Sequence, residues 1–415
     1  MHSRFYQTIF FPMNPAFHPL VCGVQAYAWG EMPKAGAKPF IADLLSLPCP
    51  EGRPFAELWI GAHPNLSAKV RLPDGTETAL DAVIRAAPEA VLGRRLAKAG
   101  ARELPFLLKV LSCDRALSIQ AHPDPKLAKT LHARDPKHYP DANPKPEIAV
   151  ALTPFDALCR FRTTAAIRRD VGRLPAIRQF LTRAGVAFSL PAKAWLKAAY
   201  AAIFRAAQKD IAHAVRAAAA EIRGSIVRSP HDGWFLELAE QYPDDRGLLS
   251  LYFLNLVHLE PGEAVYIGAN EPHAYLRGTI LECMANSDNV VRAGLTPKFV
   301  DTDVLLDMLT YEQKGPLRIQ PDGCHCCGAF NYTPPTPEFQ LDILHADHGT
   351  TMDAISDGDV SLLVVLNGAA VLRTPQGGEW AAPRGSIWLW PACLKKAAIE
   401  FTGDHTEIVC ARPNR

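Results

Sequence analysis

Three short segments of this sequence place polar side chains at alternate positions. Alternate residues of a β-strand project from the same face, so each segment would turn its polar groups to one side. Prolines before the second and third of these polar sets hold the chain extended there. The alternating residues are Ser118, Gln120 and His122 in LSIQAHP, Lys145 and Glu147 in NPKPEIAV, and His273 and Tyr275 in EPHAYL.

The three segments together offer a set of metal ligands, namely Gln120, His122, Glu147 and His273. Two imidazoles, a carboxylate and an amide oxygen suit a divalent cation and leave room for water or substrate. The two histidines favour zinc, although an amide ligand is unusual for zinc, and manganese and ferrous iron stay open. Each histidine alone would more often be a hydrogen-bonded core or loop residue, because no compact HxxEH or CxxC motif joins them.

The composition narrows the possible classes of protein. The chain has 415 residues, of which 48% are hydrophobic and 21% charged, so we expect two or three globular domains. With 44 basic and 43 acidic residues, no basic excess indicates nucleic acid or an anionic membrane as a partner. The apolar runs are too short to span a bilayer, and the N-terminal apolar cluster is too short for a secretory signal. The ten scattered cysteines suit reduced thiols, so we expect a cytoplasmic protein.

The pattern of residues changes twice along the chain. Short β-like runs separated by Gly and Pro turns precede and follow a segment with helical periodicity that is rich in alanine. This order predicts a mainly β protein with an α-helical insert: two jelly-roll or cupin-like β-barrel units plus a helical domain. The expected domains are 1–162 with 258–325 (catalytic, discontinuous), 163–257 (helical insert) and 326–415 (C-terminal β unit).

Five longer motifs run through the sequence, and the last three contain the candidate ligands. They are VQAYAWG, AELWIGAHPN, PFLLKVLSCDRALSIQAHPD, YPDANPKPEIAVALTPF and ANEPHAYLRGTILECMANSDNVVRAGLTPKF. With these motifs the chain resembles the type I mannose-6-phosphate isomerases, also called phosphomannose isomerases. The resemblance is dense in residues 22–162 and 243–302, and it is weak in the helical insert and the final hundred residues.

The resemblance implies a zinc enzyme that interconverts D-mannose 6-phosphate and D-fructose 6-phosphate, with one zinc ion per chain. It also implies a role in mannose metabolism and in the supply of precursors for GDP-mannose. The metal ligands of the family fall on the four residues proposed above, and its active residue falls on Arg292. Two departures stand out: Pro144 where the family usually has histidine, and Ala26 where a polar residue is common. Since Lys145 and Glu147 are kept, we expect a loop adjustment at Pro144 and no loss of activity.

Aldose–ketose isomerisation moves a proton between two adjacent carbons through an enediol, whose developing negative charge lies on oxygen. A divalent cation could stabilise that charge directly or could mainly order the site. The candidates for the base are Lys145, Glu282 and a metal-linked water. Arg292 is always protonated, so it suits stabilisation of an oxyanion. The candidates for substrate and phosphate binding are Ser118, Lys109, Tyr275, Lys298 and Arg292.

Four alternative interpretations fit the residues of this sequence less well. Cys324, His325, Cys326 and Cys327 are too tightly spaced for a tetrahedral zinc site, so we interpret them as an incidental thiol-rich loop. A non-catalytic sugar-phosphate sensor would lose Lys145, Glu282 or Arg292, yet all three are present. A ferrous cupin oxygenase normally has a denser set of histidines. A bifunctional nucleotidyltransferase would need a Gly-rich phosphate-binding segment, and none is visible. We expect a monomer that acts on a small sugar phosphate.

Overall fold

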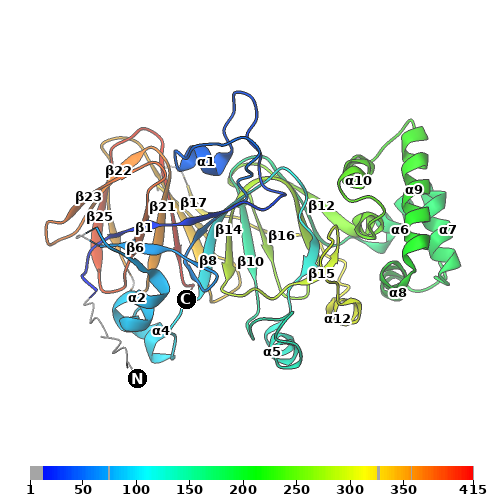
Figure 1. The fold of residues 1–415 in the computed structure, drawn as a ribbon, viewed down its shortest axis with the longest axis horizontal. Coiled ribbons are helices and arrows are strands. Elements are labelled where there is room, and N and C mark those ends of the chain that lie inside the picture. Colours follow the sequence, from blue (N-terminus) through cyan, green and yellow to red (C-terminus); the bar gives the residue numbers. More distant parts are fainter. Residues whose placement is uncertain (1–12, 73–74, 325–327, 357, 415) are drawn as a thin grey trace, which may run out of the picture.

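The computed structural model describes residues 13–414, except 73–74, 325–327 and 357. Three regions lie side by side along the long axis of the molecule (Figure 1). The C-terminal strands lie at one end, a second group of strands lies in the middle, and a cluster of helices lies at the other end. No helix in the described part of the chain is both long and apolar enough to cross a membrane.

The middle region is an eleven-stranded sheet. Its main path runs in the order β16, β13, β10, β14, β8, β3 and β2, and β9, β11, β12 and β15 branch from it. Strand β14 is the longest and pairs with β8, β10, β11 and β9, so it joins the main path to the branch. The bounds are β2 (Gly23–Gln25), β3 (Glu57–Ile60), β8 (Phe106–Cys113), β9 (Ile119–Ala121), β10 (Glu147–Ala151), β11 (Phe155–Phe161), β12 (Leu254–Leu259), β13 (Ala264–Ile267), β14 (His273–Ala285), β15 (Val291–Gly294) and β16 (Leu317–Ile319).

A nine-stranded sheet and a four-stranded sheet form the C-terminal region. The larger sheet has the order β17 (Asp322–Cys324), β18 (Ala329–Tyr332), β19 (Gln340–Ala346), β26 (Thr406–Arg412), β21 (Ser361–Asn367), β24 (Ile387–Trp390), β1 (His18–Val21), β6 (Lys69–Arg71) and β7 (Glu77–Ala79). The smaller has the order β20 (Thr351–Ile355), β25 (Lys396–Phe401), β22 (Ala369–Arg373) and β23 (Glu379–Pro383). A two-stranded sheet, β4 (Ala62–His63) and β5 (Leu66–Ser67), stands apart. Three N-terminal strands thus extend a sheet that the C-terminal residues build.

The helical segment follows β11 and ends where β12 begins. Its helices are α6 (Thr164–Arg173), α7 (Pro175–Arg183), α8 (Ala192–Arg205), α9 (Gln208–Gly224), α10 (Pro230–Gln241), α11 (Gly247–Ser250) and the 3-10 turn η1 (Leu251–Phe253). Ser229 and Asp232 form a capping box that fixes the start of α10. Shorter helices lie on the sheets: α1 (Phe40–Leu44), α2 (Leu80–Ala86), α3 (Pro88–Leu92), α4 (Arg94–Lys98), α5 (Pro125–Arg134) and α12 (Thr302–Met308).

The eleven-stranded sheet has two different faces. On one face, alternate residues such as Leu108, Val110 and Leu281 pack against Leu362 and Val364 of the nine-stranded sheet. The residues between them project from the opposite face. That opposite face carries the candidate site, so the core between the two large sheets is its rigid backing.

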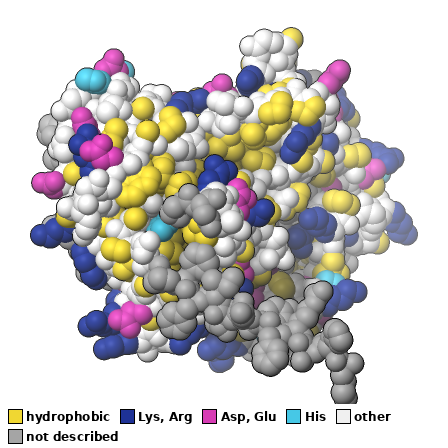
Figure 2. All heavy atoms as spheres, turned by 60° about the vertical axis from the view of Figure 1, so that its left-hand side comes forward, with side chains coloured by type: hydrophobic (Ala, Val, Ile, Leu, Met, Phe, Trp, Pro, Cys, Tyr) yellow, Lys and Arg dark blue, Asp and Glu magenta, His cyan; other side chains and the backbone are white. Residues whose placement is uncertain are grey.

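One side of the surface is seen in Figure 2, which brings the C-terminal strands forward. Hydrophobic side chains gather in the middle of this face, while basic and acidic side chains both lie scattered around its edge. This mixture matches the near-zero net charge of the sequence.

The mainly β class with an inserted helical segment is confirmed. The sheets remain open, however, because the strand pairings of the described residues close no barrel. The expected jelly-roll or cupin-like units are therefore built from packed open sheets. The domain boundaries stay a prediction. The thiol-rich loop falls largely outside the described residues, since 325–327 belong to the gaps.

Candidate active site

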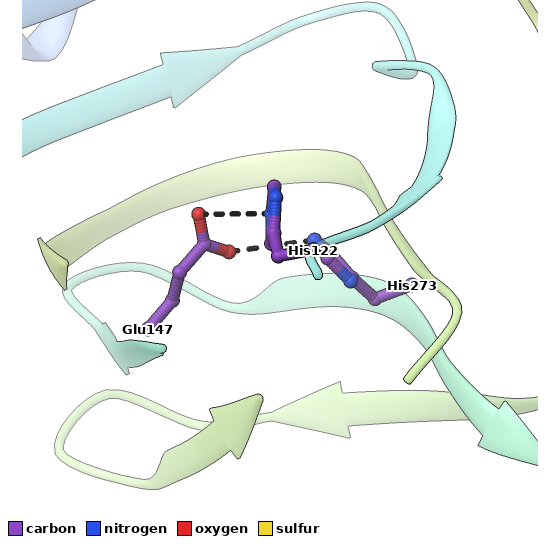
Figure 3. Close-up of side chains that lie close together, drawn as sticks. All are labelled: His122, Glu147 and His273. Atoms are coloured by element: carbon purple, nitrogen blue, oxygen red, sulfur yellow. Dashed lines mark ion pairs between the residues drawn. The ribbon is translucent and has the colours of Figure 1, made fainter. Parts of the chain in front are cut away.

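Three predicted ligands converge in the middle region of the molecule (Figure 3). His122 follows β9, Glu147 begins β10 and His273 begins β14, so three segments that are far apart in sequence each contribute one side chain. One ligand atom from each residue lies within 4.8 Å of the other two, and all three side chains are buried. Nε2 of His122 is 3.3 Å from Oε1 of Glu147, and Nε2 of His273 is 3.4 Å from Oε2.

Both imidazoles are held in the same manner. Nδ1 of His122 hydrogen-bonds the carbonyl oxygen of Asn289 at 2.7 Å, and Nδ1 of His273 hydrogen-bonds that of Glu271 at 3.1 Å. A carbonyl only accepts, so each Nδ1 carries the proton and each Nε2 presents a lone pair toward Glu147. Burial lowers the pKa of His122 to about 4, against the opposing effect of the Glu147 carboxylate. The His122 ring is therefore neutral at pH 7.

This arrangement fits a divalent cation. Nε2 of His122 is buried and makes no hydrogen bond to any residue within the described ranges. Such a nitrogen is costly to bury without a partner. A zinc-type ion would satisfy two imidazole lone pairs and a carboxylate at once. The carbonyl partners on each Nδ1 are also the usual outer contacts of metal-binding histidines.

Gln120 lies at the edge of this cluster. Its amide nitrogen is 3.4 Å from Nε2 of His273, and its amide oxygen is 3.5 Å from the hydroxyl of Ser118. The structure thus brings all four predicted ligands together, with Ser118 beside them.

Lys145 lies directly beside Glu147, with its Nζ 3.0 Å from Oε1. Burial would raise the pKa of the Glu147 carboxyl, but Lys145 and His122 outweigh it and hold that pKa well below its usual range. Glu147 is therefore ionised. Pro144 leaves this pair intact, so the first departure from the family pattern does not displace Lys145.

Glu282 and Lys109 form a second buried group on the same face of the sheet. They are directly paired across β14 and β8, and Nζ of Lys109 is 3.1 Å from Oε2 of Glu282 and 3.6 Å from Oε1 of Glu57. Burial alone would lower the pKa of Lys109, but the two carboxylates outweigh it and raise that pKa. Lys109 is therefore a permanent cation, and its ammonium also lies 5.1 Å from the Trp59 ring centroid.

Tyr275 joins the two groups. Its hydroxyl lies 3.5 Å from Oε2 of Glu147 and also hydrogen-bonds Glu282. Burial first, and then the two nearby carboxylates, raise the pKa of Tyr275 well above its usual value. The phenol therefore stays protonated as a donor between the metal-type cluster and the lysine–glutamate group.

Arg292 and Lys298 occupy different surroundings. Arg292 is half-buried and pairs with Gln120 across β15 and β9, which places both side chains on neighbouring positions of one face. Burial lowers the pKa of Arg292, yet a guanidinium remains charged at any ordinary pH. Lys298 is exposed in the loop after β15, and among the described residues its ammonium forms no ion pair with the site. Its role in phosphate binding stays a prediction.

Sequence reasoning missed the residues that support the ligands. Asn289 presents the carbonyl that orients His122, and its side-chain amide donates to the backbone oxygens of Asp141 and Asn143 at 2.7 and 3.0 Å. His63 and Asp288 form a further pair at 3.4 Å. The only available signal was the run of small polar residues after β14, SDN, which is unusual beside buried strands.

Gly278 allows β14 to serve both parts of the site. Its φ of +114° lies in a region that other residues rarely adopt, and an added Cβ would lie 2.5 Å from the carbonyl oxygen of Pro154. Residues before Gly278 pair with β11, and residues after it pair with β8 and β10. The bend therefore brings His273 and Glu282 of one strand to the same site.

Comparison with known proteins identifies the class. The family model for the phosphomannose isomerase type I catalytic domain matches residues 17–164. A solved arginine-to-alanine variant of phosphomannose isomerase from Salmonella typhimurium is 30% identical with a TM-score of 0.84, covering 96% of this chain and all of that one. A zinc-bound mannose 6-phosphate isomerase is similar, with a TM-score of 0.83, 30% identity and the same coverage. The fold is that of the phosphomannose isomerases, which are aldose–ketose isomerases.

The curated relatives specify the reaction. Mannose-6-phosphate isomerase from Homo sapiens is 37% identical over 388 residues, which cover 87% of this chain and 90% of the relative. The chain belongs to the type I mannose-6-phosphate isomerase family, and it interconverts D-mannose 6-phosphate and D-fructose 6-phosphate.

Proposed function

We propose that Gln120, His122, Glu147 and His273 hold one zinc ion that this chain needs for the isomerisation. The observation that carries the proposal is the common orientation of the two imidazoles. Each donates Nδ1–H to a backbone carbonyl and turns Nε2 toward the same carboxylate. The zinc-bound relative supports zinc as the ion. When bound, zinc would supply positive charge beside the sugar oxygens on which the enediol charge develops.

The remaining polar side chains divide into cations and candidate bases. Arg292 would stabilise oxyanion charge, because it is paired with Gln120 across β15 and β9 and its guanidinium stays protonated. Lys145 and Glu282 are the two residues that could move the carbon-bound proton, and each lies next to an opposite charge. Lys109 stays protonated, so it acts electrostatically and not as the base.

Solved variants of the Salmonella typhimurium enzyme support the positions of these residues. They replace a lysine and a glutamate two positions apart, a glutamate and an arginine ten apart, and a lysine and a histidine thirteen apart. The same three spacings separate Lys145 from Glu147, Glu282 from Arg292, and Lys109 from His122.

Substrate phosphate requires cations that are not already neutralised. Lys109 is flanked by two carboxylates, whereas Lys298 is exposed and Arg292 is half-buried. We therefore assign the phosphate to Lys298 and to the hydroxyl of Ser118, with Arg292 nearer the reacting carbons. Lys298→Ala should raise KM with little change in kcat, whereas Arg292→Ala should mainly lower kcat.

The assay that tests the proposal follows fructose 6-phosphate formation in the purified protein as isolated, after chelation and after zinc is restored. Activity should disappear and return. His273→Asn should give an inactive protein that zinc does not rescue. His258→Asn is the matched control, since His258 is an exposed histidine on β12 and should keep full activity. Full turnover in chelated, zinc-free protein would overturn the assignment.

The two candidate bases are separated by isotope exchange. Lys145→Met and Glu282→Gln are compared for uptake of solvent deuterium at C2 of mannose 6-phosphate. The variant that lacks the base should lose exchange, while loss of an electrostatic neighbour should slow exchange and turnover together.

A monomeric state, a cytoplasmic location and a role in supplying GDP-mannose precursors stay predictions. The seven cysteines whose side chains the structure describes are all free thiols, which supports a reducing compartment. Size-exclusion chromatography with light scattering tests the monomer, and metal analysis of the purified protein tests one zinc per chain.

A further inference from the structure

A second polar cavity lies in the C-terminal region, inside the sandwich of the nine-stranded and four-stranded sheets. Its volume is about 290 Å³. That volume is near the lower end of the range for small-molecule sites, so it suits a ligand the size of one sugar ring. The residues that matter for its chemistry are Asn331, Asp342, Ser361, Trp390, Cys410 and Arg412.

These residues form two neighbouring rows across the nine-stranded sheet. In one row, Asn331 is opposite Asp342, and Asp342 is opposite Cys410. In the next row, Ser361 is opposite Trp390. Inner positions of a sandwich are normally apolar. Elsewhere in this sandwich they are, as at Trp388, Ile399 and Phe401, whereas the polar residues gather around the cavity.

Asp342 is the central group of this end. Its side chain is 9% exposed, and its Oδ2 accepts a hydrogen bond from Nε of Arg412 at 2.7 Å. The orientation of the Gln340 amide that satisfies both its groups points its nitrogen at Asn414 and its oxygen at Arg412. In that orientation Gln340 does not donate to Oδ1 of Asp342, which leaves that oxygen available to a hydroxyl donor.

Stability does not account for this arrangement. Withdrawing an ion pair from water costs about as much as the pair returns, and well-packed apolar residues are often as stable. An apolar sandwich end would therefore serve the fold equally well. A polar, partly open cavity at that position is instead the arrangement found where a protein binds a hydrophilic small molecule.

The chemistry of the lining restricts the ligand. Burial raises the pKa of the Cys410 thiol to about 12, so the cavity holds no thiolate for covalent or metal chemistry. The carboxylates of Asp342 and Asp359 both line it, and each is paired with an arginine, Arg412 and Arg95 respectively. Balanced charge with two carboxylate acceptors disfavours a phosphate and favours neutral hydroxyl donors.

We propose that the C-terminal cavity binds a neutral polyhydroxyl ligand, an unphosphorylated sugar. Asp342 accepts hydrogen bonds from its hydroxyls, Ser361 donates to its oxygens, and the Trp390 side chain supplies an apolar wall. This site is separate from the isomerase site and takes a ligand that lacks the phosphate.

The test uses D-mannose as the probe and the zinc-loaded enzyme with an excess of mannose 6-phosphate, which fills the isomerase site. Saturation-transfer NMR should show contact between D-mannose and the protein under these conditions, with a dissociation constant in the millimolar range. Loss of the signal when mannose 6-phosphate is added would assign binding to the isomerase site and overturn the proposal, as would the absence of any signal.

Variants locate the binding. Cys410→Met adds volume inside the cavity and should weaken D-mannose binding at least tenfold, while Cys49→Met, at a half-buried cysteine outside the cavity, should not change it. Ser361→Ala removes one hydroxyl and keeps the Asp342–Arg412 pair, so it should weaken binding about fivefold even if Cys410→Met fails to fold. Unchanged binding in Ser361→Ala, together with unchanged binding in a folded Cys410→Met, would contradict the proposal.

Discussion

The helical insert and the candidate active site both contain buried charged side chains. We call the network in the insert closed, because each of its positive groups is paired with a negative group. In the insert, Arg162 donates to Asp170 at 2.7 Å, Arg173 pairs with Asp232 at 2.9 Å, and the Tyr252 hydroxyl donates to Asp232 at 2.7 Å. Each positive group there faces a negative group. This network joins the end of β11 to α6 and α10. Its charged groups are engaged in contacts that hold these elements together.

At the active site, the same kinds of groups do not satisfy all of their hydrogen-bonding atoms with one another. Two imidazoles turn Nε2 toward one carboxylate, and Nε2 of His122 has no hydrogen-bond partner among the described residues. Residue type alone therefore does not separate a structural network from a functional one. The balance of donors and acceptors does.

The largest expected effect comes from removing the carboxylate of the active-site cluster. Glu147→Ala should lower kcat/KM by about a thousandfold or more, because several kcal/mol of charge stabilisation depends on the metal. The variant should fold normally. Steady-state kinetics, metal analysis and circular dichroism check these expectations. Near-normal activity in a zinc-free Glu147→Ala variant would show that the active-site cluster, like the network in the insert, is not needed for metal-dependent activity.

A smaller effect is expected from the residue that supports His122. Asn289→Ala should weaken zinc binding about 10- to 100-fold, as loss of an outer contact does in other metal sites, because the loop carrying the Nδ1 acceptor loses its anchors. Competition with a chelator measures the affinity. Asn367→Ala is the control, because its amide donates to a backbone carbonyl in the C-terminal region and should leave zinc binding unchanged.

The bend in β14 connects the two parts of the site, so breaking it should affect both stability and activity. Gly278→Ala should lower the free energy of unfolding by about 1–3 kcal/mol, because alanine is strained at this φ. Gly172→Ala in α6 is the matched control, since an added Cβ meets nothing within 4 Å there, and it should be neutral or slightly stabilising. Denaturant unfolding and activity are measured on both; equal stabilities would contradict the role of Gly278.

The smallest effect is expected in the closed network. Burial would raise the pKa of Asp232, but hydrogen bonds from Arg173, the Ser229 backbone and Tyr252 outweigh it and lower that pKa. The carboxylate therefore stabilises the fold above the pKa of the unfolded chain, near 4, and loses that effect as pH falls through its lower folded pKa.

Asp232→Asn should accordingly cost about 1–2 kcal/mol at pH 7, and the difference from the unmodified chain should shrink below about pH 4. Denaturant titrations at several pH values measure this difference. Activity at pH 7 should be unchanged. A difference that grows as pH falls would show that Asp232 is not held as a stabilising carboxylate.

Much of the fold was predictable from local patterns. Alternation and Gly or Pro turns predicted the strands, and helical spacing predicted the insert. The jelly-roll or cupin-like character of the β units was predictable in the same way, although strand spacing in a sequence does not reveal whether edge strands meet. The addition of β1, β6 and β7 to the C-terminal sheet also depends on long-range pairing, which the local sequence does not encode.

The ligand set was predictable for a simple physical reason. Gln120, His122, Glu147 and His273 interrupt apolar segments at strand spacing, so their direction could be read from the sequence. Asn289 acts through its backbone carbonyl, and any residue type could supply that group. Sequence patterns therefore found the side chains that could bind the ion, and missed the backbone that orients them.

The most direct measurement of the central claim is a crystal structure of the zinc-loaded protein with anomalous diffraction at the zinc edge. One peak per chain is predicted about 2.0–2.3 Å from Nε2 of His122, Nε2 of His273 and a carboxylate oxygen of Glu147. A peak at the cysteines of the thiol-rich loop, or no peak in fully active crystals, would contradict zinc binding by His122, His273 and Glu147.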